Sequence, residues 1–503
     1  MEELSRKESI GSGIVFQYAY FAAMTLSGAA FYLYVTHLYP TSVVGSISLL
    51  LAIVGLFPAF FTLGLQYGWQ HFVSYGIGQG DSEEIGRLIR QAMRTGLLLS
   101  LAAVLFLVAT AHYISIFFFH TAEYTNLVLL LTLDIPSAIM ISILNGIMMG
   151  LQRFRNSGII GMSYIVLVYG SAVVLMNVLH SIEAVPIGWG IGYLAGVILY
   201  YTELRRGRRA KATGRREIGD VFRYSIPLYA TGILSFGASY IDRLTVAFLK
   251  DLSSIGIYTL VLLIVSGTTL LSSPIGSIIF SKFSEFYARK DNEMIREGVR
   301  ISVNAASVLY VPSALGLSAL AVPMLRVLGG PAYVVGSIPL VIILVVNGLF
   351  IAKGSFSSAL QGTRKTKVFV LSASMSLLSK LVLSLIVIPT FSLIGAAIGY
   401  SSIIVVSFAI ILYYALKAHV VMVDMRMLSR IWRSSIVMAA LVYLFAAATG
   451  FLGVLLPLYV ITGVVAYIAM LRLTSALSNA DKQLLINLIP KSLAPVRAFV
   501  DLL

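Results

Sequence analysis

Apolar stretches of about 20 residues alternate with short polar segments along most of the chain. A bilayer core of ~30 Å needs roughly 20 apolar residues per helix, so each stretch predicts one transmembrane helix. The first stretch is too long for a signal-peptide core and is predicted to be retained. The predicted spans are 13–36, 43–66, 94–117, 125–149, 157–179, 185–203, 223–248, 255–280, 301–325, 336–361, 368–388, 394–416, 434–451 and 454–471. The pattern predicts an all-α polytopic membrane protein with 14 transmembrane helices.

The basic residues fall on one side of this layout. Of the 36 lysines and arginines, 31 lie in the N-terminus, in alternate loops or in the C-terminal tail. The opposite side has only Lys250 and Arg326. Cytoplasmic loops carry the excess of basic residues in membrane proteins, so both termini are predicted to be cytoplasmic. An even number of spans requires the same placement.

Several short motifs occur twice in the same order. IGWGIGY at 187–193 returns as IGAAIGY at 394–400, and Gly45 in PTSVVG returns as Gly256 in DLSSIG. Leu151-Gln152 likewise returns as Leu360-Gln361. Such a duplication in a hydrophobic chain is typical of transporters built from two repeats, with the substrate path between them. It predicts two parallel, pseudo-symmetric lobes of six helices each, plus two C-terminal helices.

The predicted organisation has five parts. They are an N-lobe at 1–204, a basic cytoplasmic linker at 205–222, a C-lobe at 223–416, two further helices at 417–472 and a cytoplasmic tail at 473–503.

Short amphipathic helices are predicted on the cytoplasmic surface. Apolar residues in 83–93 and 291–300 follow helical spacing, with Asp81 and its repeat counterpart Asp291 in N-cap position. The tail around 481–489 has a similar pattern and predicts an interfacial helix. An ordinary solvated loop is the alternative interpretation.

Composition agrees with a membrane protein and narrows its chemistry. Hydrophobic residues make up 58% of the chain and charged residues 11%, with a mean hydropathy of +0.93. The absence of cysteine excludes disulfides, thiolate metal sites and cysteine nucleophiles. The net charge of +15 does not indicate nucleic acid binding, because the bases lie in loops between apolar spans. The basic linker is instead predicted to bind anionic membrane lipids.

No motif indicates enzymatic chemistry. The chain has neither GxxxxGK[ST] nor HExxH, and its six histidines are scattered. A membrane glycosyltransferase or glycan polymerase would need catalytic residues on an outer loop, and the predicted outer loops are short. The chain is therefore predicted to be neither an enzyme nor a metal- or cofactor-binding protein.

Five ionisable residues stand out well inside predicted spans: Asp134, Asp242, Arg243, Lys353 and Lys380. Each costs roughly 2.5–3.5 kcal/mol to insert, so each is a candidate functional residue. Three bases against two acids favour an anionic substrate. Arg243 has an alternative role, reaching the outer headgroups with Asp242 as an interfacial partner. Asp134 and Asp242 are both candidate residues for proton or sodium coupling. For Asp134, the alternative is a charge partner for one of the lysines.

Neutral polar residues add further candidates. Gln17, Asn145, Asn177, Asn304 and Asn347 all fall inside predicted spans. Such side chains commonly bond across helices in membrane proteins, which is the structural alternative for each of them.

The order of several loose motifs resembles a known family. The motifs are FYLYVTHLYPTSVVGSISLLLAI, FFTLGLQYGWQHFVSYGIGQGD, FRYSIPLYATGILSFGASYIDRLTVAFLKDLSSIGIYTLVLLI, GGPAYVVGSIPL, LQGTRKTK and IPTFSLIGAAIGY. Over about residues 11–416 the chain resembles the Wzx-like polysaccharide flippases of the multidrug/oligosaccharidyl-lipid/polysaccharide exporter superfamily.

The resemblance implies a function and a site. A member would act in the plasma membrane, moving a lipid-linked (polyprenyl phosphate or diphosphate) oligosaccharide from the cytoplasmic to the outer leaflet by alternating access. Arg243 would then meet the phosphate linkage, with Lys353, Lys380 and Gln17 as further substrate-binding candidates. Glycan-assembly enzymes would be partners. Spans 1 and 2 depart from the family pattern, because they carry no lysine or arginine.

Two other functions remain open from the sequence. A drug/cation antiporter of the same superfamily would need a membrane acid in the first lobe, where only Asp134 qualifies. A small-solute carrier of the twelve-span type fits the span count poorly.

Overall fold

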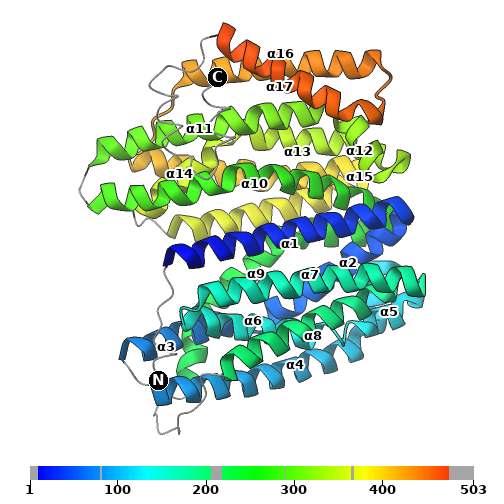
Figure 1. Cartoon of the computed structure of the whole chain (residues 1–503), viewed down its shortest axis with the longest axis vertical. Coiled ribbons are helices and arrows are strands. Elements are labelled where there is room, and N and C mark those ends of the chain that lie inside the picture. The colour runs from blue at the N-terminus through cyan, green and yellow to red at the C-terminus, as the bar shows by residue number, and fades with distance from the viewer. Residues whose placement is uncertain (1–9, 80–81, 206–217, 289–290, 364–366, 475–503) are drawn as a thin grey trace. The chain divides into compact units, whose positions relative to one another are not determined.

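A computed structural model describes residues 10–79, 82–205, 218–288, 291–363 and 367–474 of the chain (Figure 1). Within these ranges the secondary structure is helical and no strand is present. The chain divides into two compact units, residues 1–256 and 257–503.

The first unit contains nine α-helices and one 3-10 helix within the described ranges. They are α1 (Ile10–Leu38), α2 (Thr41–Phe61), α3 (Leu65–Gln79), α4 (Ser82–Phe119), η1 (Ala122–Tyr124), α5 (Thr125–Leu130), α6 (Ile135–Gly150), α7 (Phe154–Leu179), α8 (Ala184–Arg205) and α9 (Ile218–Leu249). Helix α10 (Leu252–Ala288) begins in this unit and continues into the second.

The remaining described helices belong to the second unit. They are α11 (Asn292–Ala319), α12 (Ala321–Gly329), η2 (Pro331–Gly336), α13 (Ser337–Leu349), α14 (Ala352–Gly362), α15 (Lys367–Lys417), α16 (Met425–Ala448), η3 (Gly453–Leu455) and α17 (Leu456–Leu473).

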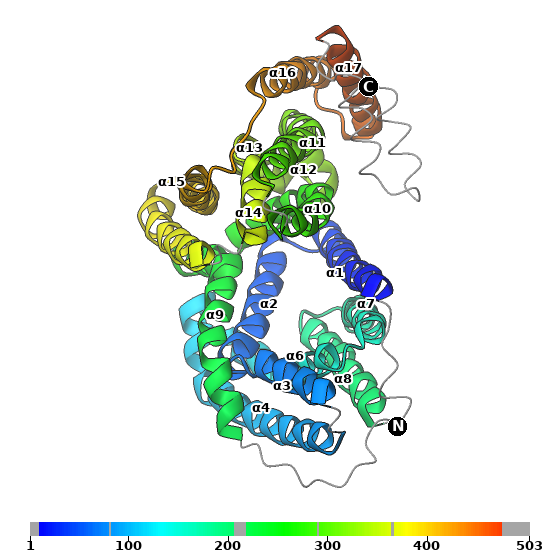
Figure 2. The same ribbon diagram turned by 90° about the vertical axis from the view of Figure 1, so that its left-hand side faces the viewer.

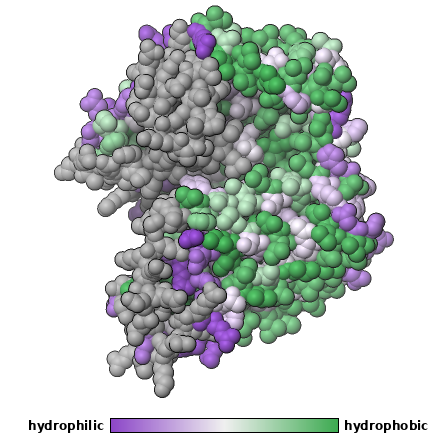
Figure 3. Space-filling model, viewed as in Figure 1, coloured by the Kyte–Doolittle hydropathy of each residue, from purple (hydrophilic) through white to green (hydrophobic). Residues whose placement is uncertain are grey.

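The helices have the length and polarity of membrane spans. Among the described residues, ten are long and apolar enough to cross a bilayer, or eleven if the bent pair Ala122–Leu130 and Ile135–Gly150 forms one span. Their outward faces are apolar, and Figure 3 shows hydrophobic residues over much of the visible described surface. The prediction of an all-helical membrane protein is confirmed. The count of 14 spans, the cytoplasmic termini and the lobe boundaries stay predictions.

Helix α9 packs with the first unit. It lies against α2, α3 and α4, as Figure 2 also shows. The sequence repeat groups residues 223–248 with the later spans, as the first of six in the second half.

The predicted break between residues 388 and 394 is confirmed. Helix α15 runs from Lys367 to Lys417, but Ser392 has a non-helical backbone (φ 50°, ψ −123°). Pro389 lies three residues earlier and lacks the backbone N–H that a continuous helix needs. Two helical runs therefore meet at this point, as the sequence pattern indicated.

The prediction of separate surface helices at 83–93 and 291–300 is wrong. Both segments are the first turns of long helices, α4 and α11. Asp291 does cap α11, because its side chain accepts a hydrogen bond from the Met294 backbone N–H. The apolar residues Leu88 and Ile295 are buried within the protein. Asp81, most of the basic linker and the predicted tail helix lie outside the described residues.

The repeated glycine motif is a helix-packing motif. In α8, a Cβ at Gly188 or Gly192 would overlap the backbone of α7 at Ala172 or Val168. In the second copy, a Cβ at Gly399 would overlap the Ser384 side chain, on the preceding run of α15. Both copies therefore allow a helix to pack closely against the one before it.

The other repeated glycines form a helix crossing. A Cβ at Gly45 on α2 would overlap the carbonyl oxygen of Leu252 on α10. Conversely, a Cβ at Gly256 on α10 would overlap the carbonyl oxygen of Thr41. The two residues that correspond in the sequence repeat are thus the two residues that let α2 and α10 touch.

Candidate functional site

Arg243 and Asp242 lie near the end of α9 and face different surroundings. Adjacent helix positions are rotated by about 100°. Asp242 is fully buried and accepts a hydrogen bond from the Arg243 backbone N–H at 2.9 Å. Arg243 is half-buried, and its guanidinium carbon lies 5.4 Å from the centre of the Tyr240 ring. Tyr32 and Tyr169 lie within electrostatic range of this arginine.

Tyrosines from four helices gather in the first unit near Arg243. We call them the tyrosine cluster: Tyr20 and Tyr32 on α1, Tyr164 and Tyr169 on α7, Tyr193 on α8, and Tyr240 on α9. The hydroxyls of Tyr20 and Tyr164 share a hydrogen bond of 3.0 Å. The ring centre of Tyr164 lies 6.3 Å from that of Tyr20 and 6.3 Å from that of Tyr193. The cluster therefore faces the interior of the helix bundle.

Buried aromatic residues hold part of this cluster in place. The Phe31 ring lies 5.6 Å from Tyr32, 5.3 Å from Tyr169 and 6.4 Å from the buried Trp189, measured between ring centres. Such tilted and edge-on pairs add about 0.5–1.5 kcal/mol each beyond area burial. The rings therefore fix α1, α7 and α8 relative to one another.

Asp134 lies at the break between α5 and α6. It precedes α6 and is fully buried, and neither carboxyl oxygen has a hydrogen-bond partner among the described residues. Its Oδ1 faces the backbone of α8 at Gly190, and Tyr193 lies within electrostatic range. A carboxyl group in such a place requires a proton or a cation to offset the cost of burying its charge.

The two candidate lysines belong to the second unit. Lys380 is fully buried in α15, with Nζ 5.3 Å from the centre of the Tyr400 ring. Lys353 is half-buried in the first turn of α14, just after the break that follows α13. Tyr400 is the repeat counterpart of Tyr193. In the first unit, Tyr193 thus lies near the buried acid Asp134. In the second unit, the equivalent Tyr400 lies near the buried base Lys380.

Four of the five neutral candidates make hydrogen bonds within the helix bundle. Gln17 donates from Nε2 to the Phe154 carbonyl at 3.0 Å, which joins α1 to α7. Asn145 accepts from the Ser157 hydroxyl at 2.7 Å, which joins α6 to α7. Asn177 and Asn347 each bond to a carbonyl of their own helix. Asn304 is buried, and its side chain has no hydrogen-bond partner among the described residues.

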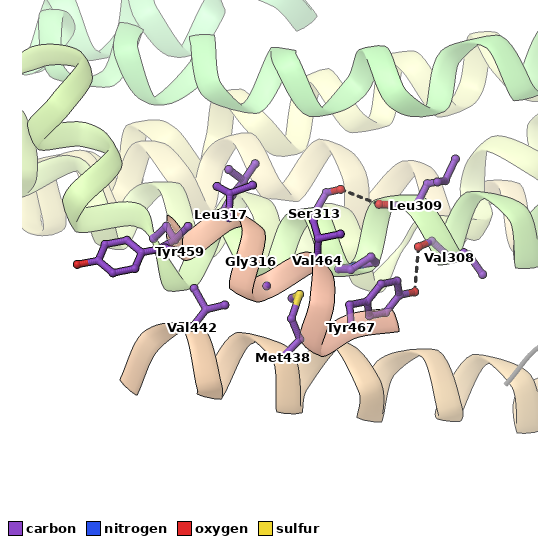
Figure 4. Close-up of a pocket in the computed structure, with 14 residues that line it drawn as sticks. Val308, Leu309, Ser313, Gly316, Leu317, Met438, Val442, Tyr459, Val464 and Tyr467 are labelled. Carbon is purple, nitrogen blue, oxygen red and sulfur yellow. Dashed lines mark hydrogen bonds between the residues drawn. The ribbon is translucent and has the colours of Figure 1, made fainter. Parts of the chain in front are cut away.

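An apolar pocket of about 380 Å³ lies in the second unit (Figure 4). Helices α11, α16 and α17 form it, and residues such as Leu317, Met438 and Val464 line it. The Tyr467 hydroxyl at its edge donates to the Val308 carbonyl at 2.9 Å. No charged side chain is among the residues that line this pocket, so it offers no partner for the charge of a phosphate group.

Within the described ranges, no group of three or more acidic or histidine residues is placed to hold a metal ion. The tyrosine cluster was missed at the sequence level. Tyrosine is common in this chain, with 27 copies, and nothing in the spacing of these six marks them as neighbours.

Comparison with known proteins gives three findings. A family model described as "Polysaccharide biosynthesis protein" matches residues 44–339. A probable low-salt glycan biosynthesis flippase, Agl15 of Haloferax volcanii, is 21% identical over 180 residues. That match covers 36% of this chain and 38% of Agl15, which is less than half of the relative's length.

Solved transporters share the fold. The lipid II flippase MurJ in an inward closed conformation superimposes with a TM-score of 0.73 at 16% identity, covering 91% of this chain and 98% of MurJ. An inward-facing multidrug resistance transporter of the MATE family gives a TM-score of 0.63 at 16% identity, covering 79% of this chain and 95% of the transporter. The resemblance seen in the sequence motifs is confirmed, and the chain is a multi-pass membrane protein.

Proposed function

The chain belongs to the polysaccharide biosynthesis protein family, and from this premise we propose that it is a flippase for a lipid-linked oligosaccharide. The substrate would be a polyprenyl phosphate or diphosphate that carries a glycan. It would pass from the cytoplasmic to the outer leaflet of the plasma membrane by alternating access. Glycan-assembly enzymes would supply it.

The placement of Arg243 is the observation that supports the proposal most directly. A charged residue inside an apolar helix bundle is costly, and here it is half-buried among tyrosines rather than turned to the outer surface. A guanidinium group in such surroundings suits the phosphate of the lipid linkage. Lys353, Lys380 and Gln17 stay further candidates. Of these, Lys380 is buried, so it would need a rearrangement of α15 to touch substrate.

Reconstitution tests this function. Purified full-length protein in liposomes should accelerate the exchange of a fluorescent polyprenyl diphosphate oligosaccharide between leaflets, relative to protein-free liposomes. An anionic lipid gains ~2.3 kcal/mol per charge for each 100 mV when it moves away from a negative interior. An imposed negative interior should therefore speed outward transfer. Exchange no faster than in protein-free liposomes would contradict the proposal.

Asp134 is proposed as the ion-coupling residue, with Asp242 as a charge partner of Arg243. Asp134→Asn keeps the shape of the side chain and removes its charge. We expect the variant to fold with equal or greater thermal stability, because a buried carboxylate without hydrogen-bond partners is costly. Transport by the wild type should respond to an imposed proton or sodium gradient, and transport by Asp134→Asn should not.

Glu123→Gln is the matched control for this prediction, because Glu123 is an exposed acid of the same unit. It should leave the gradient response intact. An unchanged response in Asp134→Asn would remove this residue from the coupling step.

The same liposomes separate the drug/cation antiporter from the flippase. Asp134 is the observation that favours the antiporter, since it is a buried acid in the first unit. A cationic dye that is exchanged for protons, without any movement of the lipid-linked glycan, would identify the antiporter.

A further inference from the structure

Four members of the tyrosine cluster keep part of their surface accessible. Tyr20, Tyr169, Tyr193 and Tyr240 come from four different helices and are all half-buried. Tyr164 lies between two of them, with its ring centre 6.3 Å from that of Tyr20 and 6.3 Å from that of Tyr193. On α8, the strongly exposed Ile191 lies about 200° around the helix from Tyr193. Tyr193 therefore faces away from the outer, lipid-facing side of its helix and toward the other tyrosines.

The chemistry of this surface suits a sugar ring. A tyrosine ring presents a flat apolar face, and its hydroxyl both donates and accepts hydrogen bonds. A pyranose ring has the matching character, with an apolar C–H face and a rim of hydroxyls. Several tyrosines together can therefore hold a neutral sugar without a charge.

Arg243 adds an anion-binding group beside the same surface. Its guanidinium stacks on Tyr240, a member of the cluster, and interacts with Tyr32 and Tyr169. Positive charge at this position opposes a cationic ligand, although tyrosine rings alone would accept one. A neutral ring joined to a phosphate matches both parts.

We propose that the tyrosine cluster of the first unit binds the sugar next to the phosphate of the transported lipid, while Arg243 binds the phosphate. This inference rests on the proposed function and deepens it, because it assigns separate residues to the sugar and to the phosphate. The cluster then selects lipids that already carry a sugar over the bare polyprenyl phosphate.

Two probes that differ only in the sugar test this assignment. Full-length protein is purified in a detergent without sugar headgroups, since a maltoside would compete. Thermophoresis then gives the dissociation constants of geranylgeranyl phosphate and of geranylgeranyl phosphoryl-glucose. Wild-type protein should prefer the glucosylated probe. Tyr193→Leu should raise the dissociation constant of that probe about 3- to 10-fold, as expected for the loss of one aromatic contact. The dissociation constant of geranylgeranyl phosphate should not change.

Three further variants sharpen the result. Tyr193→Phe keeps the ring and should lose only part of the preference, which separates a lost contact from a misfolded protein. Tyr113→Leu is the control, because Tyr113 lies on α4 outside the cluster with 70% of its surface exposed; it should change neither constant. Arg243→Gln should weaken both probes by the same factor.

Each outcome decides a different point. If Tyr193→Leu weakens the binding of both probes equally, or of neither, the sugar assignment is overturned while the flippase proposal stands. Equal binding of the two probes by wild-type protein has the same meaning. If wild-type protein binds neither probe, the proposed function fails, and the sugar site fails with it.

Discussion

Arg243→Ala is expected to lower the rate of lipid-linked glycan transfer at least about 10-fold, because a charge-assisted hydrogen bond to phosphate contributes ~1.5–3 kcal/mol. Arg243→Lys keeps the charge but loses the planar group that stacks on Tyr240 and can bind phosphate through two N–H donors. The transfer rate of Arg243→Lys should therefore lie between those of Arg243→Ala and the wild type. Initial rates of leaflet exchange in proteoliposomes, at equal protein content, measure the effect.

Arg155→Ala provides a matched control. Its guanidinium lies 5.3 Å from the centre of the Phe16 ring, almost the same stacking distance as in the Arg243–Tyr240 pair. Arg155 is exposed and lies outside the tyrosine cluster. Its replacement therefore removes the same kind of stacking contact and leaves the cluster unchanged. Transfer rates in Arg155→Ala should stay near wild type. Equal losses in the two variants would show that stacking, and not phosphate binding, explains the effect of Arg243→Ala.

Replacing Arg243 also changes the surroundings of Asp242. It is fully buried next to Arg243, and the hydrogen bond from the Arg243 backbone remains after the side chain is removed. Loss of the neighbouring positive charge still raises the cost of the buried carboxylate. Asp242→Asn combined with Arg243→Gln removes both charges. If this double variant regains thermal stability but not transport, the role of Arg243 in transport is separate from its role in folding.

The helices were predictable because long apolar runs have one stable arrangement in a bilayer. Helix α3 was not, because LQYGWQHFVSYGIGQ mixes glycine and polar residues and lacks such a run. It folds as a helix through tertiary packing, with Trp69 fully buried against its neighbours. The surface helices at 83–93 and 291–300 were wrongly separated for a related reason. Amphipathic spacing does not distinguish a face that meets lipid headgroups from one that packs into protein.

The candidate site was only partly visible in the sequence. Asp134 and Arg243 are candidates because a charge inside an apolar run is rare and costly. The tyrosines around them carry no such signal, since they are common in membrane helices and have intermediate hydropathy. Their proximity depends on how α1, α7, α8 and α9 pack together, which no local pattern records. The repeat landmarks, by contrast, turned out to mark close helix packing.

Gly45→Ala and Gly256→Ala are each expected to destabilise the protein and to impair transport strongly. Each Cβ would overlap a carbonyl oxygen of the opposing helix, so α2 and α10 must move apart. Overpacking of this kind costs about 1–3 kcal/mol. Thermal unfolding in detergent and leaflet exchange in liposomes measure the two effects. Gly170→Ala is the control, because a Cβ there meets nothing within 4 Å.

The double variant tests whether the two glycines act at one crossing. If Gly45→Ala already separates α2 from α10, the second methyl group enters space that has opened. The combined destabilisation should then be smaller than the sum of the single effects, whereas independent sites would add within about 0.3–0.5 kcal/mol. Strict additivity would show that each glycine is required by its own surroundings. Sub-additive loss would instead explain why both copies of the repeat carry a glycine here: the two positions are opposite sides of a single contact.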